Sequence, residues 1–255
     1  MLDHILRPPR LYPSLVMLVP FLSFLLWLVL VAWGEFKLSL RLKLGALGAI
    51  LNGIATLMAW ALSALGLWAA VPLVTLWEIY LGEPNAILAS ALTSMVTGLL
   101  TLVLVLGYLS AGDSLLTDSP KLAGGLLALK GLMSMALGSL LIYSLLCLQY
   151  GSLLSFVLAT RAMYPLTLAY LIIMVAAWIG SAYALMDIGS RAGSKIAYVA
   201  SGLMFSTLIL GLPLLLADVS PAFCLAVPGL ADILVGVLFI RLSRGKKVKK
   251  DQDLA

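Results

Sequence analysis

The chain has few charged residues for its length. Only 11% of its 255 residues are Asp, Glu, Lys or Arg, whereas 63% are hydrophobic. Soluble domains carry about a quarter charged residues, so this composition indicates a protein whose surface faces lipid. No segment between the apolar runs is long enough to fold as a soluble domain. We therefore expect no appended nucleotide-binding, DNA-binding or receptor-type domain.

Side chains that usually carry out chemistry are also scarce. The one histidine, His4, lies outside every apolar run, which leaves no histidine in the membrane as a haem ligand, metal ligand or general base. Cys147 and Cys224 lack Cys-x-x-Cys spacing, so we expect no disulfide framework and no metal site. Neither a paired acidic motif for Mg²⁺ nor a phosphate-binding glycine loop occurs. We expect no cofactor and no catalytic residue, and an enzyme acting on lipid is the least favoured function class.

Asn and Gln together number only four, and the net charge is positive. Scarcity of thermolabile amides is typical of heat-loving organisms, so we expect a prokaryotic protein. Six of the sixteen Lys and Arg lie in the final stretch "RLSRGKKVKKDQDLA". Basic residues beside a membrane span usually mark its cytoplasmic side. The formal charge of +5 therefore predicts a basic cytoplasmic tail, residues 242–255, and no nucleic-acid partner.

Apolar runs of about 20 residues recur along the chain, and each is long enough to cross a bilayer as a helix. They predict an all-α, polytopic membrane bundle of about seven transmembrane helices, which form a single integral membrane domain over residues 1–255. The expected spans are 12–34, 44–71, 86–111, 121–148, 165–187, 196–217 and 221–241. The run from Leu15 to Trp33 exceeds a signal-peptide core, so we expect it to be retained. In the alternative, this first segment lies in the interface and six helices cross.

The distribution of Lys and Arg predicts the orientation. With seven spans and a cytoplasmic C-terminus, 13 of the 16 basic residues lie inside, and Arg7, Arg10 and Arg161 lie outside. With six spans both ends are inside, and the inner count becomes 15 of 16. We expect a multi-pass protein of the cell membrane with a cytoplasmic C-terminus and, for seven spans, an outer N-terminus.

Three polar residues inside the spans share one depth: Asn52, Lys130 and Asp232. Each lies nine residues from a basic residue at the inner end of its own span, namely Lys43, Lys121 and Arg241. At about 1.5 Å per residue, each is roughly 14 Å from the cytoplasmic boundary, near the bilayer centre. Charges at that depth are costly unless paired. We therefore predict a buried polar centre in which Lys130 points towards Asp232 and Asn52 donates to the carboxylate.

Small and hydroxyl residues surround this level. Gly229 and Gly236 flank Asp232 by three and four residues, which suits close helix packing. Thr93, Thr97 and Thr101 share one face of the third span and are candidates for lining a pathway. Alternatively, their hydroxyls bond the carbonyl groups four residues earlier and form a satisfied polar seam.

Two function classes follow from these features. The first is a small-solute or ion transporter or permease that works through the polar centre of Lys130, Asp232 and Asn52. The second is a non-catalytic subunit or assembly factor of a larger membrane complex, in which the polar pair fixes helix register. The expected partners are the lipid bilayer and either other membrane proteins or further copies of this chain.

Overall fold

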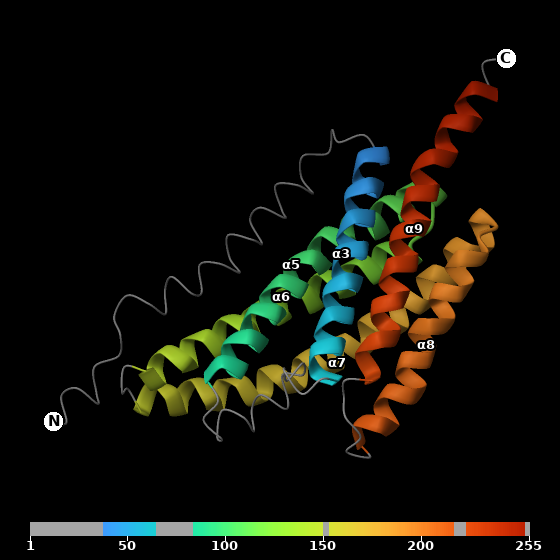
Figure 1. Cartoon of the computed structure of the whole chain (residues 1–255). Coiled ribbons are helices and arrows are strands. Elements are labelled where there is room, and N and C mark those ends of the chain that lie inside the picture. The colour runs from blue at the N-terminus through green and yellow to red at the C-terminus, as the bar shows by residue number, and fades with distance from the viewer. Residues whose placement is uncertain (1–37, 65–83, 150–152, 217–222, 253–255) are drawn as a thin grey trace.

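The computed structural model describes residues 38–64, 84–149, 153–216 and 223–252. In that part of the chain the regular structure is entirely helical, as the composition predicts (Figure 1). The six helices there are α3 (Leu38–Ala64), α5 (Pro84–Leu115), α6 (Ser119–Gln149), α7 (Leu153–Ala192), α8 (Lys195–Leu216) and α9 (Phe223–Gln252). The predicted first span, 12–34, lies outside the described residues.

Five of the described helices are long and apolar enough to cross a membrane. The qualifying segments are Leu38–Ala59, Ser90–Leu115, Ser119–Cys147, Phe156–Ala192 and Ala226–Arg244. In α8 the apolar segment Lys195–Ile209 is shorter. The protein is therefore an apolar helical bundle suited to a multi-pass membrane location, and the predicted total of about seven spans is not established by the described residues.

The fifth predicted span begins too late in the chain. The predicted span 165–187 starts at a proline, but α7 begins twelve residues earlier and contains Pro165 inside it. Proline removes one backbone hydrogen bond and crowds the preceding turn. Pro165 is exposed, so the crowding falls on a face of α7 that no described helix covers. The helix-forming residues before it, "LLSFVLATRAMY", continue the helix across the proline.

Two other helix boundaries differ from the sequence-based expectation. The span predicted at 44–71 begins six residues late, because the stretch "LSLRLK" before it forms the first turns of α3. Similarly, α9 continues to Gln252, eleven residues past the predicted end of its span at 241. Both places are rich in Lys and Arg, and these basic residues have high helix propensity. The charged residues therefore continue the helix here instead of ending it.

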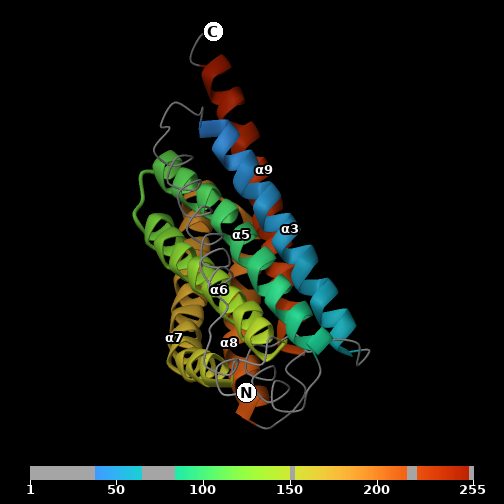
Figure 2. The same cartoon turned by 90° about the vertical axis from the view of Figure 1, so that its left-hand side faces the viewer.

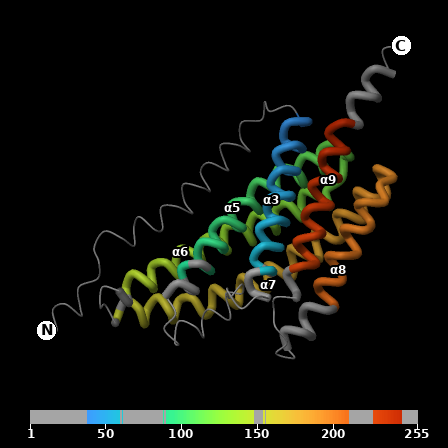
Figure 3. The backbone as a smooth tube through the Cα atoms, in the orientation of Figure 1, coloured from blue at the N-terminus to red at the C-terminus, as the bar shows by residue number. Residues whose placement is uncertain are grey.

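The helices form a closed ring. Packing runs in the order α3, α5, α6, α7, α8, α9 and back to α3, and α5 also reaches α7 and α9 across the middle. Figures 1 and 2 show α3 beside α9 from two directions, and Figure 3 draws the same backbone as a tube. Neighbouring helices are antiparallel. Residues near the ring interior, such as Tyr108 and Phe239, are therefore approached from several helices at once.

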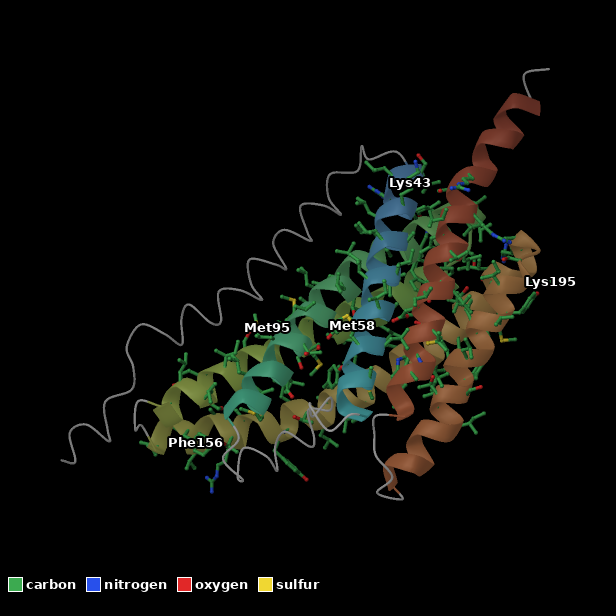
Figure 4. The ribbon with its side chains drawn as sticks, in the orientation of Figure 1. Lys43, Met58, Met95, Phe156 and Lys195 are labelled. Carbon is green, nitrogen blue, oxygen red and sulfur yellow. The ribbon has the colours of Figure 1, made fainter. Side chains whose placement is uncertain are left out.

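One end of the bundle gathers most of the described basic residues, and we call it the basic end. It combines the starts of α3, α6 and α8 with the ends of α5, α7 and α9. Figure 4 labels Lys43 and Lys195 there and Phe156 at the opposite end. The described cations at the basic end are Arg41, Lys43, Lys121, Arg191, Lys195, Arg241 and Arg244. Among the described residues, Arg161 is the one cation towards the other end.

Candidate functional site: a buried polar centre

Glycines bring the backbones of α3 and α9 into direct contact. A Cβ atom added to Gly53 would lie 2.5 Å from the carbonyl oxygen of Gly229, and one added to Gly236 would lie 2.9 Å from that of Ala46. Real Cβ atoms do not approach this closely. The two helices can pack at this distance only because these positions lack side chains. Short side chains on the two helices can therefore meet.

Asn52 and Asp232 meet at this seam. The Asn52 Nδ2 group donates a hydrogen bond of 2.7 Å to Asp232 Oδ2. Both residues are buried, with exposed fractions of 4% and 8%. The Asn52 Oδ1 atom is buried and has no hydrogen-bond partner. An unpaired polar atom in an apolar interior costs free energy, so this acceptor is available for a donor or cation that enters the bundle.

Two residues that the sequence did not single out complete the surroundings. Tyr108 of α5 is almost fully buried, and its ring packs edge-on against Phe239 with centroids 5.3 Å apart. Its phenol group lies in the neighbourhood of Asp232 and of Ser181 on α7, and the Ser181 Oγ atom has no hydrogen-bond partner. The Ser181 hydroxyl is itself buried. Groups from α3, α5, α7 and α9 thus converge in the ring interior.

The predicted direct ion pair between Lys130 and Asp232 is not formed. Among the described residues, Lys130 makes no ion pair within 4.0 Å. It is half-buried on α6 and acts on Asp232 as a positive charge at longer range. The reason lies in the order of the ring: α6 packs on α5 and α7, whereas Asp232 is on α9 and packs on α3. Depth along the sequence could not show that α5 separates them.

The threonines of α5 adopt the satisfied-seam arrangement. Thr97 Oγ1 donates to the Thr93 carbonyl oxygen at 2.8 Å, and Thr101 Oγ1 donates to the Thr97 carbonyl oxygen at 2.7 Å. Thr93 and Thr97 are half-buried, and Thr101 is 1% exposed. Thr101 and Tyr108 are seven residues apart and share one face of the helix. The stripe of hydroxyls therefore leads along α5 to the polar centre.

The chemistry of this centre is that of hydrogen bonding and charge. It contains one carboxylate, one carboxamide, one phenol and one aliphatic hydroxyl, with an ammonium group nearby. Within the described residues, no three His, Cys, Asp or Glu side chains lie together in a way that would hold a metal ion. A carboxylate in this setting can exchange partners or a proton as a charged group approaches.

Tyr108 and Ser181 could have been found from the sequence only in part. Tyr108 continues the threonine stripe at helical spacing, which is a readable signal. Ser181 follows Gly180 on a helix rich in small residues and resembles any other packing residue.

Comparisons of the chain with protein-family models, with curated proteins and with solved structures find no match. The candidate function therefore rests on the geometry alone.

Proposed function

We propose that this protein is a small multi-pass transporter or permease for a small solute or ion, with Asp232 at its centre. The observation that carries the proposal is the buried Asn52–Asp232 hydrogen bond, which leaves Asn52 Oδ1 without a donor. Ionisable residues inside membrane spans commonly mark substrate or ion pathways. A purely structural pair has no need of an unsatisfied acceptor beside it.

Lys130 would act as the mobile counter-charge. Because it is half-buried and lies beyond ion-pair distance, its ammonium group can move closer to or farther from Asp232 as a ligand enters. The threonine stripe of Thr93, Thr97 and Thr101 would supply hydroxyl oxygens along the route to Tyr108. In this arrangement the charge on Asp232 is compensated alternately by Lys130 and by the ligand.

The proposal is tested by the water accessibility of the polar centre. In a variant that lacks Cys147 and Cys224, Ser181→Cys would be treated with a membrane-impermeant thiosulfonate in sealed vesicles of both orientations. A permease must open its centre to each side in turn. We therefore expect Ser181→Cys to react from both faces of the membrane, with mass spectrometry measuring the modified fraction.

The matched control is Ala182→Cys. Ala182 is the next residue on α7 and is fully buried, but its carbonyl oxygen accepts the Ser201 hydroxyl of α8 at 2.8 Å, so this position faces the neighbouring helix. We expect no reaction at Ala182→Cys from either side. If Ser181→Cys is as unreactive as this control in vesicles of both orientations, the polar centre is sealed and the transport proposal is wrong.

A second candidate is a non-catalytic subunit or assembly factor. The observation that favours it is the poor cover of α7, whose span is 28% buried within the bundle, compared with 44–50% for the other four. A partner helix could cover that face, as could lipid. Purification from native membranes in mild detergent, followed by intact-complex mass, distinguishes these cases: a stoichiometric partner favours a subunit, and a monomer or homo-oligomer favours the permease.

The proposed location is the cell membrane of a prokaryote, with the basic end in the cytoplasm. The clustering of Lys and Arg at one end of the ring supports this orientation. A cytoplasmic C-terminus follows from it, since α9 ends at the basic end. A reporter domain fused to the C-terminus, active only in the cytoplasm, tests the orientation directly.

A further inference from the structure

Arg41 occupies an unusual position at the basic end. It lies on the same face of α3 as Gly45, Gly48 and Asn52, so it is directed towards the ring. Its Nε atom is buried and has no hydrogen-bond partner, although the residue as a whole is half-buried. Arginine cannot lose its proton in a protein. A buried N–H of a guanidinium group therefore calls for an acceptor, and preferably an anion.

A second unsatisfied group lies at the same level on the facing helix. A Cβ atom added to Gly45 would lie 2.3 Å from the Cα of Gly107, which fixes the register of the antiparallel helices α3 and α5. One turn towards the basic end, Arg41 therefore faces Ser110. The Ser110 side chain is fully buried, and its Oγ atom has no hydrogen-bond partner. Two orphaned polar atoms from two helices thus share one layer.

Among the described residues, the charges assigned to this layer are positive and form no ion pair. No described carboxylate lies within ion-pair distance of Arg41. The nearest acidic residue on α5, Asp113, is already paired with Lys121 at 3.1 Å. The register set by the Asn52–Asp232 bond places the exposed Arg244 of α9 near the same level. An anion in this layer would meet two guanidinium groups and one hydroxyl.

We propose that Arg41 and Ser110, with Arg244 at the rim, bind a phosphate group. A guanidinium fork can bond two phosphate oxygens at once, and a serine hydroxyl can donate to a third. The phosphate would belong either to an anionic phospholipid at the membrane boundary or to a free phosphate ion. This inference is independent of the transport proposal, because a permease and a subunit would both carry the site.

The experiment uses the delipidated full-length protein in detergent. The two probes are short-chain phosphatidylglycerol and inorganic phosphate at constant ionic strength, and diacylglycerol of equal chain length is the control without phosphate. Binding is measured from the rise in the tryptophan-fluorescence melting temperature and, for lipid, from retained mass in native mass spectrometry. We expect phosphatidylglycerol to bind and diacylglycerol not to bind. If inorganic phosphate binds as well, the site accepts free phosphate. If phosphatidylglycerol binds and inorganic phosphate does not, the site is specific for lipid.

The variants separate a built site from general charge attraction. Losing a charge-assisted hydrogen bond should weaken binding about tenfold in Arg41→Ala. Arg41→Lys should recover only part of the lost affinity, because an ammonium group cannot bond two phosphate oxygens in the paired geometry of a guanidinium group. The matched control is Lys43→Ala, which removes one positive charge two residues away on an exposed face (Figure 4). We expect its affinity to stay close to that of the wild type.

Two outcomes would overturn the inference. One is the absence of binding by both phosphate probes, and the other is an equal loss in Arg41→Ala and Lys43→Ala. If Arg41→Ala does not fold, Arg41→Lys and Lys43→Arg provide the same comparison with charge retained at both positions. Ser110→Ala removes one neutral donor and should weaken binding less than Arg41→Ala.

Discussion

Helices α9 and α7 are held in the ring by different means. In α9, Gly229 and Gly236 press against the backbone of α3, and 50% of its membrane-length segment is buried. In α7 only 28% of the membrane-length segment is buried, and large side chains such as Tyr164 and Ile172 are exposed. What fixes α7 at the basic end is a polar clasp around Asp187. Its carboxylate accepts the hydroxyls of Thr117 and Ser119 and a hydrogen bond of 3.0 Å from Arg191 Nε.

The difference teaches where a membrane protein can place a buried polar pair. A short Asn–Asp bond in the interior needs two helices packed closely enough for short side chains to meet, and in α3 and α9 glycines provide this close approach. At a helix end, long or flexible groups can reach each other through water-exposed turns. The polar centre is therefore on the glycine seam of α3 and α9, and the α7 clasp is at the basic end.

The largest expected effect comes from filling the α3–α9 seam. In Gly53→Val the new side chain would meet the Gly229 carbonyl oxygen and Ile233, and backbone cannot move aside easily. We expect a loss of about 3 kcal/mol or more in unfolding free energy, measured by denaturation in mixed micelles. The control is Gly125→Ala on α6, where a Cβ atom meets nothing within 4 Å.

In Gly125→Ala the better helix propensity of alanine should leave the free energy unchanged or raise it by about 0.5–1 kcal/mol. Should both substitutions have the same small effect, the close backbone contact of α3 with α9 would be wrong.

The second effect concerns the partner of Asp232. A double-mutant cycle of Asn52→Ala and Asp232→Ala should give a coupling energy of about 1 kcal/mol, as for other hydrogen bonds between membrane helices. The cycle of Lys130→Met with Asp232→Ala should give a smaller value, because these two groups interact only at longer range. Unfolding in mixed micelles measures both cycles.

A larger coupling for Lys130 than for Asn52 would restore the direct ion pair that the sequence suggested. It would also contradict the placement of α5 between α6 and α9.

The third effect concerns the clasp of α7. Asp187→Ala removes the carboxylate that accepts hydrogen bonds from two hydroxyls and from Arg191. The Asp187 side chain is 23% exposed. We expect a loss of about 1 kcal/mol, because solvent and salt weaken such contacts. Hydrogen exchange at the end of α7 should also rise locally. The control, Asp118→Ala, alters a fully exposed side chain of the same turn that contacts Lys121 at 4.0 Å, and should have a smaller effect on both measurements.

Several features of the fold could be predicted from the sequence. Apolar runs predicted spans at 86–111, 121–148 and 196–217, because lipid requires the backbone to be satisfied within each segment. The structure has helices at Pro84–Leu115, Ser119–Gln149 and Lys195–Leu216. The proline at 165 misled the prediction for α7. A proline can start a helix or lie inside one, and its local sequence does not distinguish the two cases when the proline ring faces away from the bundle.

The candidate site was predicted from the spacing of single residues, which does not fix their arrangement. The equal spacing of Asn52, Lys130 and Asp232 from basic residues is a property of each helix separately. Which side chains touch depends on the order of helices around the ring. That order put Asn52 opposite Asp232, brought Tyr108 and Ser181 beside them, and left Lys130 at longer range.

The sequence by itself determined the class of protein, the helical secondary structure and the basic end, since hydrophobicity, length and charge are properties of single segments. Only the tertiary structure decided which polar groups are paired and which are left without partners. Asn52 Oδ1, Arg41 Nε and Ser110 Oγ are unsatisfied because neighbouring helices exclude water from them and offer no complementary group. That property belongs to the packing of several helices, and no single segment carries it.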